Sequence, residues 1–292
     1  EPGQVRNQLV LDLSRREVIE YVYESVASIL RQANIEYVKW DMNRPFTDIG
    51  SSELDADRQG EIMHRHTLAV YELQGRLLKE FPYLLLENCS SGGARFDPGM
   101  LYFSPQIWCS DDTDAIERLA IQESTALMYP LSVIGAHVSD CPNHTVGRVT
   151  PFKTRGIIAM AGTFGYELDV TKIPEEDRNM IASQVETYKK YCPIIQSGDY
   201  YRIASYQSNH YFDCYEIVSK DKKEAILVFV QVIAQPNMHS IRVKLKGLDN
   251  EAKYKINGTV YDADALMNGG FIIKRPWGDF QAELFHIEKI ND

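Results

Sequence analysis

Short strand-like runs alternate with longer amphipathic segments along the first two hundred residues, and this alternation restricts the possible folds more than any other feature. Apolar or β-branched runs predict strands at 9–14, 35–41, 83–88, 107–109 and 133–138. Apolar residues at helical spacing predict helices over 15–31, 58–81, about 115–128 and 174–195. The continuous apolar run Tyr83–Leu86 is typical of a strand that is buried on both faces. Alternating strands and helices imply βαβ units around a parallel sheet.

About five such units fit residues 1–197, too few for a closed eight-stranded barrel. We therefore expect the C-terminal part of a (β/α)8 TIM barrel. Beyond Gly198 the pattern changes to short strands separated by turn residues, with no convincing helix. These strands are expected at 211–218, 224–233, 240–245, 254–256 and 270–273. The fold class is accordingly α/β over 1–197, followed by an antiparallel β-sandwich domain over 198–292.

The composition excludes several classes of function. A net charge of −10 over 292 residues argues against a nucleic-acid partner. No run of about 18 apolar residues exists, so no membrane partner is expected. Five cysteines without a paired spacing favour a reduced, cytoplasmic setting over a disulfide framework. The first residues, Glu1-Pro2-Gly3-Gln4, resemble no signal peptide and lack an initiator Met, so we expect a segment of a longer chain.

Carboxylates follow two of the predicted strands. Asp41 ends the run Ile35–Asp41, and Asp111 comes just after Ile107–Cys109. In a parallel α/β barrel, reactive side chains lie at the C-terminal ends of strands. The strand at 83–88 is expected between these two, which would let both carboxylates face one pocket. A pair of carboxylates on either side of one bond is the arrangement that a glycosidase requires.

Each carboxylate also has a simpler interpretation. Asp41 could cap a turn, but Lys39 shares its strand face and would favour an ionised, nucleophilic Asp41. Asp111 could cap the helix near Ala115, although Asp114 or Thr113 suits that role better. Close negative charges would instead let Asp111 hold a proton as a general acid. A divalent cation is disfavoured, because the glycine and distal glutamate of an EF-hand loop are missing; we expect no metal and no cofactor.

Two further segments carry candidate residues. Cys89-Ser90-Ser91-Gly92-Gly93 follows a strand and could be a phosphate cradle, but it lacks the lysine of a P-loop. A pocket wall of small residues is the better interpretation, and Cys89 is disfavoured as a nucleophile because no histidine lies in the same motif. His137 and His144 are interpreted as structural histidines.

Three motifs resemble, in this order and spacing, the α-galactosidases of glycoside hydrolase family 36. The motifs are Lys39-Trp40-Asp41-Met42-Asn43-Arg44, Glu87-Asn88-Cys89-Ser90-Ser91-Gly92-Gly93 and Trp108-Cys109-Ser110-Asp111-Asp112-Thr113-Asp114. The resemblance covers almost all of residues 1–200. It implies a retaining hydrolase of terminal α-galactosides such as melibiose and raffinose-type sugars. Asp112 departs from the family, which often has Asn there.

The resemblance assigns roles to individual residues. It makes Asp41 the nucleophile and Asp111 the acid/base. It places Arg6, Lys39, Asn43, Cys89 and Gly92 at the galactose site. Trp40 is also expected to bind substrate, as an apolar wall of the pocket, with a place in the barrel core as the alternative. It also implies a bacterial cytoplasmic homo-oligomer, a tetramer as the full-length chain. Two alternatives stay open: an α-galactosyl transglycosidase that uses the same residues, and an inactive truncated fragment.

Overall fold

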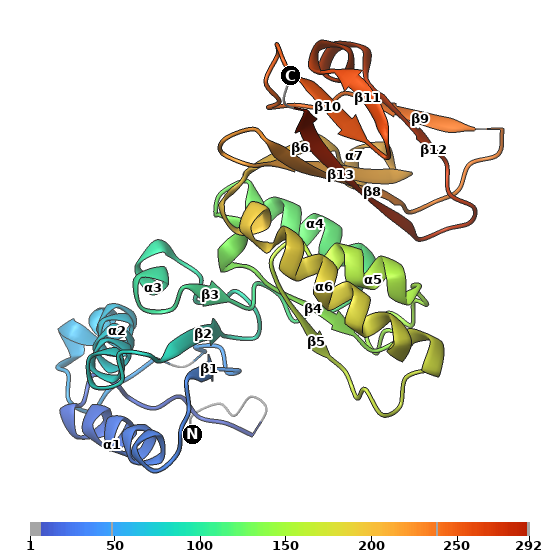
Figure 1. The fold of residues 1–292 in the computed structure, drawn as a ribbon. Coiled ribbons are helices and arrows are strands. Elements are labelled where there is room, and N and C mark those ends of the chain that lie inside the picture. The colour runs from blue at the N-terminus through green and yellow to red at the C-terminus, as the bar shows by residue number, and fades with distance from the viewer. Residues whose placement is uncertain (1–6, 48, 238, 291–292) are drawn as a thin grey trace. The chain divides into compact units, whose positions relative to one another are not determined.

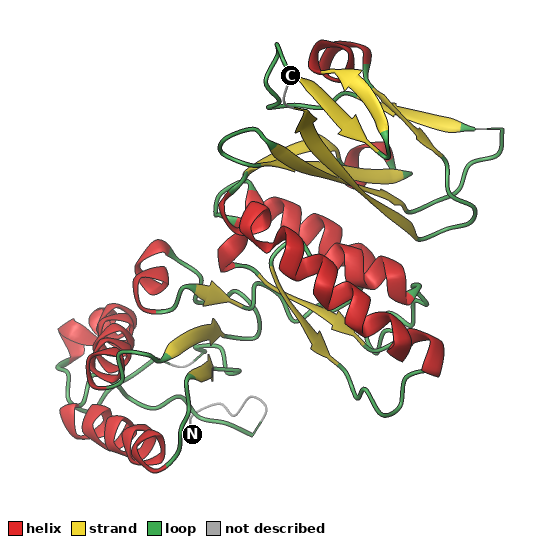
Figure 2. Ribbon diagram, in the orientation of Figure 1, coloured by secondary structure: helices red, strands yellow, loops and turns green. Residues whose placement is uncertain are grey.

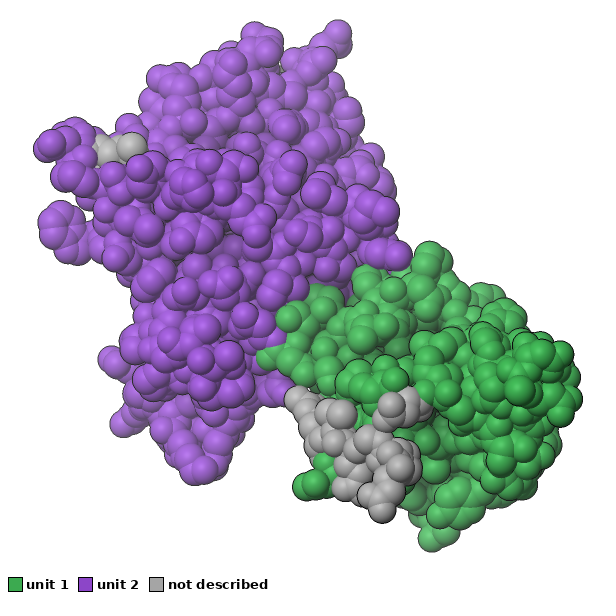
Figure 3. All heavy atoms as spheres, turned by 180° about the vertical axis from the view of Figure 1, so that it is seen from behind, with its two compact units in different colours: residues 1–111 green, residues 112–292 purple. Residues whose placement is uncertain are grey.

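The computed structural model describes residues 7–47, 49–237 and 239–290, which divide into two compact units, 1–111 and 112–292 (Figure 3). The sequence places a domain boundary at 197/198 instead, and that boundary stays a prediction. Each unit is described by itself. Within the described residues, no helix combines the length and the apolar character that a membrane span requires.

The first unit contains a short parallel sheet with order β1-β2-β3, together with three α-helices (Figures 1 and 2). In chain order its elements are α1 (Arg16–Gln32), β1 (Tyr37–Asp41), the 3₁₀ helix η1 (Ala56–Glu61), α2 (Ile62–Glu80), β2 (Leu85–Cys89), α3 (Pro98–Phe103) and β3 (Gln106–Ile107). The predicted position of β2 between the two strands that precede the carboxylates is therefore confirmed.

One face of this sheet packs against helices. Apolar side chains of α1 and α2, Leu73 and Leu77 among them, form a buried cluster with Leu84 and Leu86, against which Val38 and Trp40 pack. Since side chains alternate along a strand, Lys39 and Asp41 lie on the opposite face. The helices thus cover one side of the sheet and leave the carboxylate side uncovered by them.

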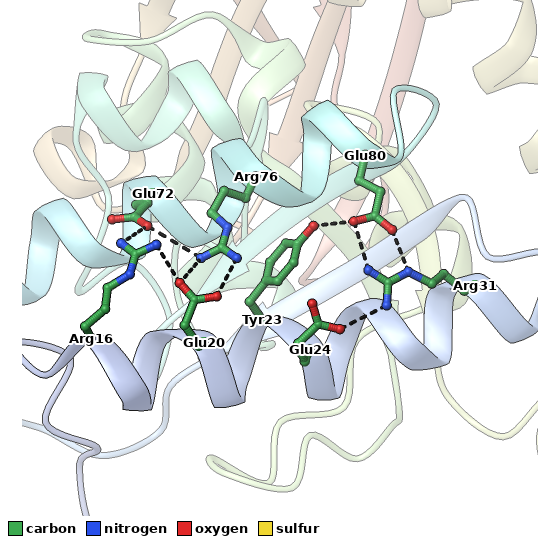
Figure 4. A network of polar contacts seen from close by, with 8 residues as sticks. All are labelled: Arg16, Glu20, Tyr23, Glu24, Arg31, Glu72, Arg76 and Glu80. Carbon is green, nitrogen blue, oxygen red and sulfur yellow. Dashed lines mark hydrogen bonds and ion pairs between the residues drawn. The ribbon is translucent and has the colours of Figure 1, made fainter.

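A network of charged side chains joins the outer faces of α1 and α2 (Figure 4). Arg76 donates to Glu20 at 2.8 and 3.0 Å, and its guanidinium lies 3.8 Å from the ring centroid of Tyr23. The other ion pairs join Arg16 to Glu20 and Glu72, and Arg31 to Glu24 and Glu80. Exposed pairs of this kind contribute little to stability because solvent screens them, so the apolar cluster is what stabilises the packing of the two helices.

The prediction of a strand at 9–14 is wrong. Residues 9–14 form no strand, and Asp12 instead accepts hydrogen bonds from the backbone N–H and hydroxyl of Ser14 and from the Ser51 hydroxyl. The Asp12 carboxylate therefore organises a turn before α1. The other predicted helices and strands of residues 1–197 are present, with ends that differ by a few residues.

The second unit begins with helices around a parallel strand pair. Its first elements are α4 (Ala115–Ala126), η2 (Leu131–Val133), β4 (Gly135–Ser139), α5 (Phe152–Ala159), β5 (Thr163–Glu167) and α6 (Glu175–Ser197). β4 and β5 pair in parallel, from Gly135 opposite Thr163 to Ser139 opposite Glu167. Glu175, Glu176 and Asp177 lie in the first turn of α6, where acidic side chains complement the helix dipole.

An antiparallel sheet follows directly after α6, with strand order β11-β10-β13-β8-β7-β6, and a second pair joins β12 to β9. The elements are β6 (Asp199–Ala204), α7 (Tyr206–Asn209), β7 (Phe212–Val218), β8 (Glu224–Gln231), β9 (Ser240–Val243), β10 (Lys253–Ile256), β11 (Thr259–Asp262), η3 (Ala265–Gly269), β12 (Phe271–Lys274) and β13 (Gln281–Ile290). The sequence predicted neither β6, β11 and β13 nor the short helix α7.

Two carboxylates are buried in β7, where a sheet core would normally exclude charge. Burial raises the pKa of Asp213 to about 7 and that of Glu216 to about 8. Asp213 is 3% exposed and accepts a hydrogen bond from the backbone N–H of Tyr206. The folded protein therefore binds a proton at Asp213 up to about neutral pH, whereas the unfolded chain loses that proton near pH 4.

We predict that Asp213 makes the folded state less stable as pH rises from about 4 to above 7. Its contribution to stability is complete below the unfolded pKa and is lost as pH passes the folded pKa. Between pH 5 and pH 8 the stability of the Asp213→Asn variant relative to the parent protein should therefore rise by up to about 3 kcal/mol, since one pKa unit corresponds to about 1.4 kcal/mol and only the range from pH 5 to about 7 contributes. Urea unfolding at both pH values measures this difference. Asp221→Asn, an exposed control with a lowered pKa, should not show the gain; an equal gain in both variants would contradict the prediction.

Candidate active site

The register of the parallel strands brings the end of β1 beside the end of β2. Asp41 lies opposite Cys89, and the backbone N–H of Met42 donates to the Cys89 carbonyl at 3.1 Å. The hydroxyl of Ser90 donates to the Met42 carbonyl at 2.9 Å. The motif around Asp41 and the Cys89–Gly93 turn, which are 48 residues apart in the sequence, therefore form one continuous surface.

Donors from both strands surround the Asp41 carboxylate. The Asn43 amide donates to Asp41 Oδ2 at 2.6 Å, and the Cys89 thiol also forms a hydrogen bond with Asp41. Burial raises the pKa of Cys89 to about 11, and the neighbouring Asp41 charge acts in the same direction. Cys89 therefore stays a protonated thiol and a donor, in agreement with the interpretation that it is no nucleophile.

Lys39 forms its ion pair with Glu87. The Lys39 ammonium lies 3.6 Å from Glu87 Oε1 and 5.1 Å from the ring centroid of Trp108. From the sequence, Lys39 is expected to act on Asp41 directly, so the ion pair with Glu87 is a new feature of the site. Glu87 stands opposite Lys39 in the strand register, which explains the pairing.

The turn after β2 packs closely against the segment that leads to Asp111. Gly92 has a φ of +86°, and a Cβ there would lie 2.8 Å from Ser110 Cα and 3.1 Å from the Asp111 nitrogen. A larger residue would clash with this backbone, so only glycine fits both the conformation and the space. The same turn thus contacts the Asp41 strand on one side and the Asp111 segment on the other.

The three aspartates after β3, Asp111, Asp112 and Asp114, have different contacts. Asp114 caps α4 by accepting from the backbone N–H groups of Ile116 and Glu117, both at 3.0 Å, and it also pairs with Arg148. Asp112 accepts from the backbone N–H of Asp114 at 2.9 Å. The predicted cap is therefore confirmed for Asp114, while Asp111 is exposed. In the described ranges, no group of three or more His, Cys, Asp or Glu side chains could hold a metal ion.

Arg95 is a residue that the sequence analysis missed. Its guanidinium donates to the carbonyls of Trp40 and Cys89, at 3.1 and 2.7 Å, and so joins the ends of β1 and β2 beneath Asp41. It also lines a cavity of about 390 Å³ together with Asp41 and His66. Burial, with the Arg95 charge, lowers the pKa of His66 to about 4. An arginine two residues after the Gly92-Gly93 turn at a strand end was the signal available in the sequence.

The remaining predicted residues have different placements. Trp40 packs against the helix-facing core and also lines this cavity, which favours the core role that the sequence left open. Arg6 lies outside the described residues. His137 pairs with Glu167 across β4 and β5, with 3.0 Å between His137 Nδ1 and Glu167 Oε2. The roles of these residues toward a sugar stay predictions.

Residues 1–198 match the Melibiase family, and residues 212–287 match the glycosyl hydrolase family 36 C-terminal domain. Alpha-galactosidase AgaA of Geobacillus stearothermophilus is 46% identical over 98% of this chain, and alpha-galactosidase Mel36A of Lactobacillus acidophilus is 45% identical over all of it. The chain spans only 39% and 40% of the length of these two relatives.

Solved structures show the same likeness. The crystal structure of AgaA has a TM-score of 0.95 over 99% of this chain and 40% of that chain, at 45% identity. A variant of AgaA in complex with raffinose has a TM-score of 0.96 at 44% identity, again over 99% of this chain and 40% of that one. The chain therefore belongs to the melibiase family, the α-galactosidases of glycoside hydrolase family 36.

Proposed function

We propose that the protein is a retaining α-galactosidase that hydrolyses terminal α-galactosyl residues of melibiose and raffinose-type oligosaccharides. The observation that carries this proposal is the placement of Asp41 and Asp111 after alternate strands of one parallel sheet. Two strand spacings separate the axes of β1 and β3 by roughly 10 Å. Two Asp side chains that lean toward one another can close this gap to the roughly 5–5.5 Å that retention requires.

The proposed reaction is a double displacement. Asp41 attacks the anomeric carbon while Asp111 donates its proton to the departing glycosidic oxygen, and a covalent galactosyl-enzyme forms. Asp111 then removes a proton from water, which releases galactose in its original α configuration. Asn43 and Cys89 hold the nucleophile by hydrogen bonds.

The likeness to the family also supports the proposed architecture. We propose that β1 to β5 are successive strands of a (β/α)8 barrel, and that the antiparallel sheets form a β-sandwich domain. The parallel pairing of β1, β2 and β3, with helices on one face, supports the barrel. A cytoplasmic homo-tetramer is proposed as the functional assembly; five cysteines without a paired spacing suit a reducing compartment.

The same two carboxylates would also serve a transglycosidase. We expect hydrolysis to dominate in dilute substrate, because water then greatly outnumbers any competing sugar hydroxyl. Product analysis with a nitrophenyl α-galactoside, with and without an added acceptor sugar, measures the ratio of free galactose to transferred galactose. Mostly transferred galactose at low acceptor concentration would favour the transglycosidase instead.

Replacing Asp41 by glycine should lower turnover by roughly a thousandfold or more, because the covalent step loses its nucleophile. Azide should then enter the vacated space and restore turnover of an aryl α-galactoside, giving β-galactosyl azide. Product analysis by NMR checks the anomeric configuration. The parent protein is the control and should not be accelerated by azide. Near-normal turnover of Asp41→Gly without azide would refute the nucleophile assignment.

Replacing Asp111 by alanine should separate substrates by their leaving groups. Hydrolysis of raffinose, whose leaving oxygen needs a proton, should fall by about 10² to 10⁴, the usual contribution of a general acid. Formation of the galactosyl-enzyme from a dinitrophenyl galactoside should fall far less. Steady-state and burst kinetics on both substrates measure the contrast. Asp112→Ala is the matched control and should affect both substrates alike; a similar contrast there would count against Asp111.

A further inference from the structure

A buried carboxylate lies one row below the proposed nucleophile. Glu87, in the middle of β2, is 1% exposed, although the chain around it is an apolar strand. Side chains from both neighbouring strands contact its carboxylate. The Tyr37 hydroxyl and the Gln106 amide donate to Oε2, the latter at 2.9 Å, and the Lys39 ammonium lies 3.6 Å from Oε1.

The strand register explains why these groups meet. Lys39 is the partner of Glu87 across β1 and β2, and Glu87 is the partner of Gln106 across β2 and β3. These three residues form one row on the face opposite the helices. Asp41 and Cys89 form the next row toward the carboxyl ends of the strands. Glu87 is thus the acidic member of the polar layer directly beneath the proposed catalytic layer.

Lys39 stands between two carboxylates. Asp41 follows it by two residues on the same strand face, about 6.6 Å further along the strand. A flexible lysine could form an ion pair with either carboxylate. Glu87, aided by the Trp108 ring 5.1 Å from the ammonium, draws the cation to the lower row. An ammonium paired with Asp41 would instead occupy the nucleophile.

We propose that Glu87 is a positioning residue, whose buried carboxylate holds the Lys39 ammonium away from Asp41 and directed at the galactose site. Removing this carboxylate would free Lys39 to pair with the nucleophile. The proposal rests on the proposed function of Asp41. It gives a role to a buried charge that would otherwise only cost stability.

The charged and titratable groups around Asp41 set the expected pH response. They are Tyr37 and Lys39 on its own strand, Glu87 and Cys89 on β2, Arg95 after β2, His66 on α2 and Asp111 after β3. The negative charge of Glu87 opposes ionisation of a nearby carboxylate, and a freed ammonium would favour it. Loss of the Glu87 charge and release of the Lys39 ammonium would therefore both favour the ionised form of Asp41.

The test is the Glu87→Gln variant, which keeps the size and the hydrogen-bond acceptor but removes the charge. We expect kcat/KM on an aryl α-galactoside to fall about tenfold to a hundredfold, as for a reacting group held slightly out of place. The acidic limb of the kcat/KM profile should also move to lower pH, by about half a unit or more. Tyr37→Phe is the matched control, because it removes another partner of the same carboxylate and keeps the charge; its acidic limb should not move.

A folded Glu87→Gln variant whose acidic limb coincides with that of the parent would overturn the proposal. If Glu87→Gln does not fold, the comparison of Lys39→Met with Lys39→Met/Glu87→Gln decides, because the double variant leaves no unpaired charge. A residue that acts through Lys39 should change kcat/KM less than about threefold once Lys39 is absent. A further loss of tenfold or more would show an independent role and refute the proposal.

The azide experiment on Asp41→Gly keeps the two proposals apart. If azide rescues Asp41→Gly but Glu87→Gln leaves the acidic limb in place, only the role of Glu87 is wrong. If azide gives no rescue and no inverted product, the assignment of Asp41 fails whatever the Glu87 variants show. Each result therefore bears on a different residue.

Discussion

The in-register parallel pairing of β1 with β2 is the constraint on which the site depends. It places Lys39 opposite Glu87 and Asp41 opposite Cys89, so the Lys39–Glu87 ion pair and the contacts of Asp41 occupy successive rows of one sheet face. A shift by one residue would turn Lys39 and Asp41 toward the buried cluster between the helices and the sheet, where neither charge has a partner. The apolar contacts of Val38, Trp40 and Leu86 with that cluster therefore select the register that builds the site.

Much of this arrangement could be predicted from local patterns. The run ending at Asp41 and the acidic cluster at 111–114 indicated two strand ends, and the predicted cap at Asp114 is present. Glu87 and Arg95 were missed for a physical reason: both act through partners distant in sequence. Arg95 joins the carbonyls of Trp40 and Cys89, and Glu87 meets Lys39, 48 residues earlier. For Glu87, the sequence offered only one indication, a single charged residue within an apolar strand.

The errors in the fold have similar causes. Residues 9–14 have the composition of a strand, but the side chain of Asp12 bonds locally to Ser14 and Ser51, which favours a turn. β13 was missed because charged and polar residues, Glu283, His286 and Glu288 among them, interrupt the apolar residues of Gln281–Ile290. Yet β13 pairs with both β8 and β10 and lies inside the sheet. Its position follows from pairing with residues 31 to 64 positions earlier in the sequence, which no local pattern reports.

The buried acids of the two units have different surroundings. This difference distinguishes the acid with a proposed role in the site from acids that affect stability. Glu87 has a cation within 3.6 Å and hydroxyl and amide donors from neighbouring strands, so its charge is compensated within the sheet. Asp213 and Glu216 have raised pKa values because burial dominates over their few hydrogen bonds. A carboxylate that faces a cation across strands can hold that cation in place, whereas a carboxyl group that takes up a proton offers only hydrogen bonds. Charge compensation across strands is therefore the reason that we propose Glu87, and not the acids of β7, as the buried group that serves Asp41.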